Sequence, residues 1–530
     1  MRGRNLILAT VASAALLAMP AVAQETVAEP VDVFAIPAQV REPTEAEFAD
    51  VGRLVTEAET ARGEERFDDA EAAAQQLVAL ASATYGPGHP VTASSRNILG
   101  QIAFMRGDLT TAESIFSEGL EIRRAALGPT HPDVAESLNN LSSVLSWQGR
   151  YDEAPAPLMQ ALDIWRATLG PQSPEVVEGL RNLGRAWIDL ARYDDAMAAY
   201  EEALAIQTAI DAPATDRAST LRGIGDVAMM TGDYVVADAR LTDSLRVLEA
   251  AGFEGLGLGL TLTSLGSLRD RQGRADEAVL LHGRATDVFA AILGPEHPFV
   301  AAGLENTSGA FAEMGRFDRS VDLQQRALQI RSTAQGSSHP DTSVSRRSLA
   351  ATLLMAGRPA EALPIAELAL ADLNASHPDG LESARAELVA ARAEFATFPD
   401  DPARALPRAR RAQERLEPLL GADHPETLEA RALVAEVMAA SGQTQAAVEL
   451  RVAVASDGVR RLGPAHPRAL AHTQAAVGAL EGLGRPAAAL DLLRPVLDPE
   501  RANDRGARAA RRGVWRSAVR LLWTLSDPGA

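Results

Sequence analysis

Apolar residues follow a helical rhythm through most of this 530-residue chain. Leu138, Leu141 and Leu145 are three and four residues apart, and after a turn at Gly149 residues 154–162 continue the same spacing. Such spacing gathers apolar side chains on one face of an α-helix. The pattern therefore predicts pairs of amphipathic helices joined by short turns. The low share of aromatic residues, 4%, also fits a helical chain better than a β-sandwich.

Two turn motifs separate the helical segments, and both recur at one period. The first, here the proline turn, begins with Gly and ends in His-Pro or Ser-Pro. It occupies residues 86–90, 128–132 and 170–174, which are 42 residues apart, and again 294–298, 336–340, 421–425 and 463–467. Degenerate copies lie near 212–213, 252 and 376–378. The second, here the glycine turn, interleaves with it, with Gly at positions such as 107, 149, 273 and 315. Glycine can take the left-handed conformation that ends a helix, and proline suits the first turn of the next one.

Each repeat is thus a helix, a glycine turn, a second helix and a proline turn. A two-helix unit cannot bury both of its faces alone, so neighbouring units are expected to stack into a solenoid. One repeat departs from the pattern. Residues 378–420 lack the turn glycine and carry Phe398-Pro399-Asp400-Asp401-Pro402 instead. We expect the two helices of this repeat to be splayed apart.

These units resemble tetratricopeptide repeats, in the 42-residue form seen in kinesin light chains and in many bacterial proteins. The residues that carry the resemblance best are 131–141, 148–151 and 161–164, with the sequences HPDVAESLNNL, QGRY and ALDI. About eleven repeats fit between residues 44 and 497. The resemblance implies an all-α fold of tandem helix-turn-helix repeats stacked into a right-handed superhelical solenoid. It is a weak guide to function, because the family is defined by architecture and not by chemistry.

In this family the first helix of each repeat lines the inner surface of the superhelix, which commonly takes extended peptides. A polar side chain nine residues before the turn glycine resembles the family's contact to a peptide backbone, and an amide there offers donors and an acceptor together. This slot holds Asn140, Asn182, Ser264, Asn306 and Ser348, whereas Gly223, Ile98 and Leu433 interrupt the series. Gly223 and Ser264 are expected to leave room for the backbone of a peptide to approach.

The position one residue earlier adds positive charge to the predicted binding surface. It holds Asn97, Asn139, Arg181, Arg222 and Arg347. Arg185 lies one helical turn after Arg181 on the same face. Guanidinium groups on an otherwise acidic chain favour a clamp for an acidic or carboxylate-bearing peptide. The alternative is that these amide and Arg side chains are solvated, or make capping and intrahelical bonds.

The composition of the chain argues against several other functions. The formal net charge of −20 repels phosphate backbones, so nucleic acid is not an expected partner. The absence of Cys excludes disulfides, thiolate zinc sites and cysteine nucleophiles. Most of the His residues lie in or near proline turns, which stacked helices ~8–10 Å apart would hold roughly 20 Å from one another, too far to share a zinc ion. They are expected to cap or pack at helix starts. With no phosphate loop and no nucleophile motif either, we expect no metal, no cofactor and no enzymatic activity.

Both ends carry segments outside the repeats. Residues 1–23 match a secretory signal peptide, with Arg2 and Arg4 before an apolar stretch and a cleavage site after Ala23. An uncleaved membrane anchor is the alternative. Residues 24–43 are expected to form a flexible linker. Residues 498–530 are basic, and one helical stripe holds Arg508, Arg512, Arg516 and Arg520. We expect a helix that caps the end of the solenoid, the alternative being contact with anionic lipid or an acidic partner.

The sequence therefore predicts a periplasmic or secreted, non-catalytic scaffold. It would bind an extended peptide or a partner protein along the concave face of its repeats. The alternative is a regulatory subunit whose repeats gate a separately encoded enzyme or sensor.

Overall fold

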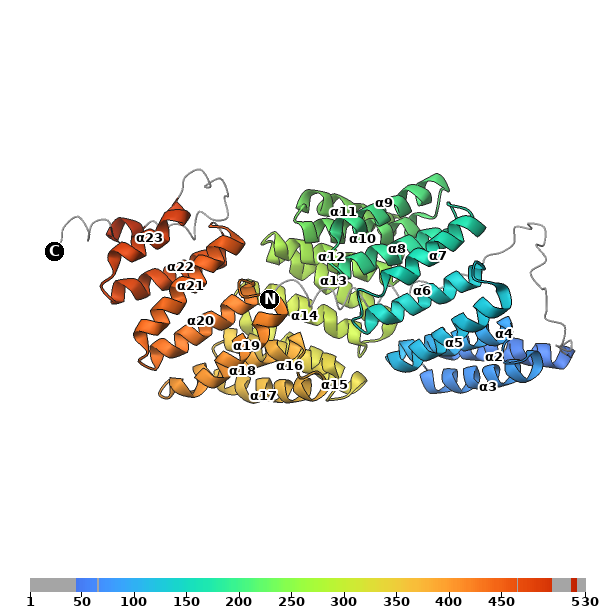
Figure 1. The fold of residues 1–530 in the computed structure, drawn as a ribbon, viewed down its shortest axis with the longest axis horizontal. Coiled ribbons are helices and arrows are strands. Elements are labelled where there is room, and N and C mark those ends of the chain that lie inside the picture. The colour runs from blue at the N-terminus through green and yellow to red at the C-terminus, as the bar shows by residue number, and fades with distance from the viewer. Residues whose placement is uncertain (1–43, 64–65, 465, 498–515, 522–530) are drawn as a thin grey trace. The chain divides into compact units, whose positions relative to one another are not determined.

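The computed structural model describes residues 44–63, 66–464, 466–497 and 516–521. Helices follow one another through these residues, and no β-strand occurs among them. The expected all-α fold of tandem helix-turn-helix repeats is confirmed (Figure 1). The chain divides between Gly273 and Arg274 into two compact units, here called the N-terminal unit and the C-terminal unit.

The N-terminal unit runs from α2 to α12. Its helices are α2 (Glu45–Gly63), α3 (Phe67–Tyr85), α4 (Pro90–Met105), α5 (Leu109–Leu127), α6 (Pro132–Trp147), α7 (Pro155–Thr168), α8 (Pro174–Asp189), α9 (Tyr193–Ala209), α10 (Ala214–Thr231), α11 (Tyr234–Ala250) and α12 (Leu256–Arg271). The even-numbered helices are the first helices of their repeats, and the odd-numbered ones are the second helices.

The C-terminal unit runs from α13 and repeats the same alternation. Its elements are α13 (Ala275–Leu293), α14 (Pro298–Glu313), α15 (Phe317–Gln335), α16 (Pro340–Met355), α17 (Pro359–Ser376), α18 (Leu381–Thr397), the short 3-10 helix η1 (Pro402–Ala405), α19 (Leu406–Leu420), α20 (Pro425–Ala440), α21 (Thr444–Leu462), α22 (Pro467–Gly482) and α23 (Pro486–Leu497). None of the helices in the described residues is long and apolar enough to cross a membrane.

The turns have the geometry that the sequence predicts. Gly128 ends α5 with φ = 86° and donates to the carbonyl of Arg124 at 3.1 Å. Pro132 then begins α6, and Gly149 ends that helix with φ = 78°. Among the described residues, the positive φ values outside glycine are those of Ala191 and Asp211, at 55° and 50°. These two residues flank α9, so both turns around that helix hold a side chain where the other repeats favour glycine.

The histidines of the proline turns are helix caps, as expected. Six of them accept a hydrogen bond at Nδ1 from the backbone N–H two residues later, at 3.1–3.3 Å; they are His89, His131, His297, His339, His424 and His466. Ser173 replaces histidine in one turn and accepts from the N–H of Val176 at 3.4 Å. Each cap satisfies a backbone donor that the first turn of a helix leaves unpaired.

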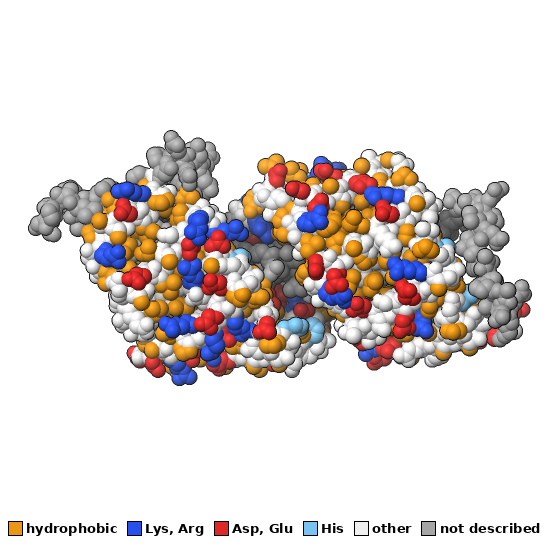
Figure 2. Space-filling model, viewed as in Figure 1, with side chains coloured by type: hydrophobic (Ala, Val, Ile, Leu, Met, Phe, Trp, Pro, Cys, Tyr) orange, Lys and Arg blue, Asp and Glu red, His pale blue; other side chains and the backbone are white. Residues whose placement is uncertain are grey.

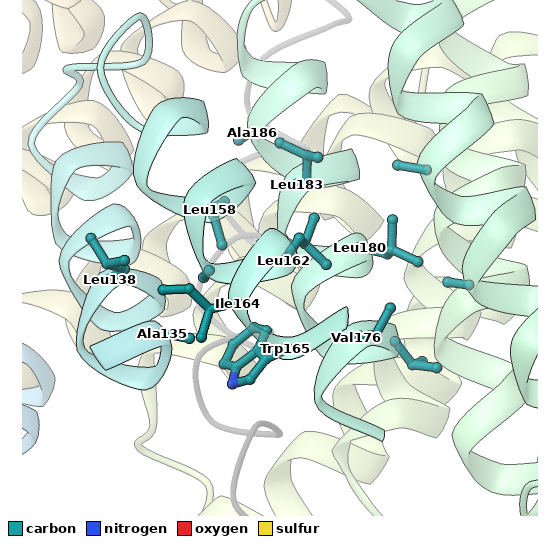
Figure 3. Close-up of a cluster of buried hydrophobic side chains, with 14 of the residues drawn as sticks. Ala135, Leu138, Leu158, Leu162, Ile164, Trp165, Val176, Leu180, Leu183 and Ala186 are labelled. Carbon is teal, nitrogen blue, oxygen red and sulfur yellow. The ribbon is translucent and has the colours of Figure 1, made fainter. Parts of the chain in front are cut away.

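The core of the N-terminal unit is formed by successive helices packed on one another. Figure 3 shows Leu138 of α6, Leu158, Leu162 and Trp165 of α7, and Leu180 of α8 in one cluster. Leu138, Leu158 and Leu162 are among the positions three and four residues apart that the sequence pattern selected. Because each helix contributes to the clusters on both of its sides, one repeat buries its apolar face only when its neighbours are present.

The first helices lie closer to one another than the second helices do. In the N-terminal unit α6 contacts α8, and α10 contacts both α8 and α12. In the C-terminal unit α16 contacts α14 and α18. Among the described second helices, only α21 and α23 contact each other comparably. Each unit therefore bends toward its first helices, whose remaining free side forms the inner surface.

The irregular repeat at 378–420 is not splayed, and that expectation is wrong. Helices α18 and α19 pack against each other, and η1 contacts both of them. Glu387, only 4% exposed, accepts from Arg411 at 3.1 Å and from Arg415 at 3.3 Å. These ion pairs and the buried cluster that contains Leu388 of α18 and Leu416 of α19 hold the repeat together without a glycine turn.

The end of the described chain covers the last repeat. Residues 516–521 are helical, and Ala518 and Leu521 are buried in the cluster that contains Val477 and Leu480 of α22. Arg520 donates to both carboxylate oxygens of Glu481, at 3.2 and 2.6 Å. The expected signal peptide at 1–23, the linker at 24–43, and Arg508 and Arg512 of the basic stripe lie outside the described residues.

Candidate functional site

The predicted peptide-binding amides of the N-terminal unit bind one another across repeats. The Nδ2 atom of Asn140 on α6 donates to Oδ1 of Asn97 on α4 at 2.8 Å. In the same way Asn182 on α8 donates to Asn139 on α6 at 2.8 Å. Asn97 in turn donates to Glu136 at 3.1 Å. These four Asn residues therefore form a ladder, here the amide ladder, that joins the first helices and uses part of the capacity expected for a peptide.

The Arg residues of α8 and α10 behave differently. Arg181, Arg185 and Arg222 form no hydrogen bond and no ion pair with any described residue. Many guanidinium groups elsewhere are paired, such as Arg123 with Glu136 at 3.1 Å and Arg331 with Glu305 at 3.1 Å. Others that have no partner among the described residues, such as Arg240 and Arg319, are exposed to solvent. On the face shown in Figure 2, acidic and basic side chains are likewise interspersed. Arg222 is buried and Arg181 and Arg185 are half-buried, so these unpaired guanidinium groups on neighbouring first helices mark a place for an anion.

These three Arg residues belong to one polar stripe on the inner side of the unit. On α8 the stripe contains Glu178, Arg181, Asn182, Arg185 and Asp189, which recur three and four residues apart. The opposite side of α8 carries its buried apolar residues. Arg222 and Asp226 continue the stripe on α10, which contacts α8. Burial lowers the pKa of Arg181 and of Arg222, because surrounding protein disfavours the charged form.

The acidic residues of the stripe have pKa values above their ordinary range. Burial raises the pKa of Glu178, of Asp189 and of Asp226, and the nearby Arg residues offset this only in part. Ser264 on α12 is buried and helps to lower the pKa of Asp226 again. The stripe thus combines unpaired cations with carboxylates that gain protons readily.

Tyr200 is the residue of this site that the sequence pattern did not reveal. It comes from α9, a second helix, and is 7% exposed. A Cβ atom at Gly184 of α8 would lie 2.8 Å from its ring, and one at Gly223 of α10 would lie 2.5 Å from it. The ring therefore passes between the two first helices through a notch made by two glycines. The expectation that Gly223 leaves room for a peptide backbone is wrong, because the Tyr200 ring fills that space.

Comparison with known sequences decides the family. A sequence profile of the tetratricopeptide repeat matches residues 54–125, 96–162, 133–209, 258–333 and 299–375, together more than half of the chain. The chain is a tetratricopeptide-repeat protein. No curated protein matches it closely enough to count as a relative.

Several solved structures are similar to parts of this tetratricopeptide-repeat protein. A putative kinesin light chain from Podosopora anserina, with nearly identical repeats, is 23% identical over 38% of this chain and 95% of that chain, with a TM-score of 0.33. BtubC (BKLC) from P. vanneervenii is 22% identical over 47% of this chain and 93% of that one, with a TM-score of 0.35. The apo form of RapI is 16% identical over 53% of this chain and 97% of that one, with a TM-score of 0.41.

The remaining predicted contacts of the tetratricopeptide array lie in the C-terminal unit and are not gathered into one site. Arg347 on α16 is buried and forms an ion pair with Glu382 at 3.0 Å. Asn306 on α14 has a buried Nδ2 atom with no hydrogen-bond partner among the described residues. Ser348 is partly exposed beside Arg347. At α8 and α10, by contrast, three unpaired Arg residues that are buried or half-buried lie on neighbouring helices.

No metal centre is found in the part of the array that the structure describes. There, no three His, Asp or Glu residues converge as metal ligands would. The turn histidines use Nδ1 for capping, as described above. The polar side chains of the inner surface at α8 and α10 can act through hydrogen bonds and charge.

Proposed function

We propose that this tetratricopeptide-repeat protein is a non-catalytic scaffold of the cell envelope, which binds an extended, acidic segment of a partner protein. Tetratricopeptide repeats mediate contacts between proteins, and this chain is a protein-interaction scaffold of that kind. The observation that carries the more specific proposal is the set of unpaired guanidinium groups of Arg181, Arg185 and Arg222 on the inner side of the N-terminal unit. Such groups form short, charge-assisted hydrogen bonds with carboxylates.

The geometry of the first helices supports an extended ligand. The polar stripe continues from α8 to α10, which contact each other directly. A peptide that crosses these helices meets Arg181 and Arg185 on one and Arg222 on the next. An extended chain advances ~3.3 Å per residue, and packed helices are ~8–10 Å apart, so about three peptide residues span one first helix to the next.

Site-specific photocrosslinking in living cells tests this surface. A photoreactive amino acid at Arg185 should crosslink the partner, and a competing acidic peptide should reduce the crosslink. The same probe at Glu201, an exposed residue on the second helix α9, serves as the control and should give no such product. Crosslinks from Glu201 alone would place the binding surface on the outer side of the array.

The envelope location is a separate part of the proposal. It rests on Arg2, Arg4, the apolar stretch that follows and the small residues before Gln24. N-terminal sequencing of the protein recovered from the periplasm should begin at Gln24. Intact Met1 in a membrane pellet would instead identify an uncleaved anchor.

A further inference from the structure

The notch that holds Tyr200 is used differently in the neighbouring repeats. Phe116 of α5 lies over Gly100 of α4, where an added Cβ would come within 2.7 Å of its ring. Leu241 of α11 lies over Gly225 of α10 in a similar way, at 2.6 Å. Both side chains only fill space. Tyr200 fills its notch too, but it also carries a hydroxyl group through the layer of first helices.

The two glycines locate that hydroxyl, because the Tyr200 ring lies against Gly184 and Gly223, which are the chain neighbours of Arg185 and Arg222. Burial raises the pKa of Tyr200, and the charge of Asp226 raises it further, whereas Arg185, Arg222 and Arg181 act to lower it. The phenol therefore lies among the polar stripe residues of α8 and α10, although its own backbone belongs to α9. It forms no hydrogen bond with any described residue. A buried tyrosine hydroxyl usually forms a hydrogen bond, so this hydroxyl can donate to an acceptor on a ligand.

Four donors without acceptors thus converge from three helices. We propose that Tyr200 is a specificity-determining residue of the inner surface, and that its hydroxyl joins the guanidinium groups of Arg181, Arg185 and Arg222 to bind a carboxylate of an acidic peptide. This inference rests on the proposed function and names the residue that selects the ligand. Tyr200 contacts the ligand, whereas Gly184 and Gly223 position Tyr200.

The charge of the stripe favours a carboxylate over a phosphate. Three Arg residues face Glu178, Asp189 and Asp226, so the fixed charges of the stripe nearly cancel when the acids are ionised. A single negative charge with two acceptor oxygens suits such a site. A phosphate group carries about −1.5 to −2 at neutral pH and costs more to remove from water, while the nearly balanced fixed charges of the stripe return little extra attraction.

A matched pair of peptides tests the inference on the full chain. One peptide alternates glutamate with serine over ten residues, and the other has glutamine in place of glutamate. Calorimetric titration should show that the wild-type protein binds the glutamate peptide more tightly. Tyr200→Phe keeps the ring in its notch and removes only the hydroxyl, so affinity for the glutamate peptide should fall about tenfold, as for a lost hydrogen bond to a charged group. Affinity for the glutamine peptide should change little.

Two further variants separate ligand contact from fold. Tyr193→Phe removes a hydroxyl at the start of the same helix and should leave both affinities unchanged. Gly223→Ala places a Cβ atom 2.5 Å from the Tyr200 ring and should displace the hydroxyl, so it should lower the preference for glutamate as Tyr200→Phe does. Circular dichroism checks that each variant remains helical.

The outcomes distinguish this inference from the function on which it rests. Binding of the glutamate peptide with the same affinity by wild type and Tyr200→Phe would overturn the role of Tyr200 and leave peptide binding standing. Binding of neither peptide by the wild type would overturn both proposals. A phosphoserine peptide that binds more tightly than the glutamate peptide, and loses this advantage in Tyr200→Phe, would overturn the preference for carboxylate.

Discussion

The side-chain amide of Asn182 donates to the side-chain oxygen of Asn139 across 2.8 Å and thereby joins α8 to α6. The same bond joins Asn140 to Asn97 one repeat earlier, at the same distance. In both cases the residue nine positions before a turn binds the position one residue earlier in the preceding repeat. Residues expected from sequence to hold a ligand thus contribute to the stacking of the array, while the neighbouring Arg residues keep their donors unpaired.

Asn182→Ala should destabilise the N-terminal unit. Asn139 is 6% exposed, and the substitution leaves its Oδ1 atom without this donor, which costs about 1–3 kcal/mol for a buried polar group. Chemical denaturation followed by circular dichroism should show a lower midpoint. Ser348→Ala is the control, because the side chain of Ser348 forms no hydrogen bond with a described residue, and its midpoint should stay near that of the wild type. Equal midpoints for Asn182→Ala and wild type would show that the amide ladder contributes nothing.

The 42-residue period of the sequence predicts the structural features that each repeat forms by itself. Helices, glycine turns and histidine caps depend on contacts within a few residues, so a spacing of 42 residues is enough to place them. The amide ladder depends on how far one repeat is rotated against the next, which a period does not encode. The role of Tyr200 is still harder to predict from the sequence, because it depends on Gly184 and Gly223. These glycines belong to two other helices and come to face Tyr200 only in the folded protein.

The irregular repeat at 378–420 also shows that contacts between helices are hard to predict from the local sequence. Its missing turn glycine suggests splayed helices, and the local sequence offers no replacement for it. The replacement is Glu387, which lies on α18 and pairs with Arg411 and Arg415 on α19. Such pairs between helices are decided by packing, and charged residues at these positions are equally compatible with a solvated face.

His89→Ser should make the first proline turn insensitive to acid. Burial lowers the pKa of His89, and its neutral imidazole accepts from the N–H of Val91. Its contribution to stability is therefore present above the unfolded pKa of about 6.5 and is lost as pH falls through the lower folded value. Ser caps a helix at any pH, as Ser173 does here.

The comparison for this cap is thermal unfolding at pH 7.5 and at pH 5. His89→Ser should match the wild type at pH 7.5 and exceed it at pH 5, by about 1 kcal/mol for one N-cap. Ser173→Ala should lower stability by a similar amount at both pH values. If His89→Ser gains nothing over the wild type at pH 5, the imidazole cap tolerates protonation.

Asp226→Asn and Glu382→Gln should change stability in opposite directions. Burial raises the pKa of Asp226, so its contribution is present below the unfolded pKa of about 3.9 and is lost as pH rises through the folded value. Asp226→Asn should therefore unfold at a higher temperature than the wild type at pH 7.5, with the gain fading toward pH 4. Burial also acts to raise the pKa of Glu382, but Arg347 and Arg385 outweigh it and lower that pKa.

Glu382 thus stabilises the fold above its unfolded pKa of about 4.3, and this contribution is lost as pH falls through the lower folded value. Glu382→Gln should unfold earlier than the wild type at pH 7.5 and approach it in acid. Melting temperatures of the three proteins between pH 4 and 8 check both signs. A lower melting temperature for Asp226→Asn at pH 7.5 would mean that the ionised Asp226 and Arg222 stabilise each other more than burial opposes them.

The last prediction separates binding from stability within one polar stripe. Arg185 has unpaired donors, whereas Asn182, one residue of the amide ladder, has a partner on α6. Arg185→Gln should weaken binding of the glutamate peptide about tenfold and make its affinity less dependent on salt, because a charge contact is lost. Its unfolding midpoint should stay near that of the wild type. Asn182→Ala should show the reverse, a lower midpoint with the salt dependence of the wild type, measured where the protein is fully folded. Arg240→Gln, on the exposed side of α11, controls for the loss of one positive charge anywhere on the chain. If Arg240→Gln flattens the salt dependence as much as Arg185→Gln does, the peptide responds to net charge rather than to the stripe, and the outer surface or the basic C-terminal segment becomes the place to search.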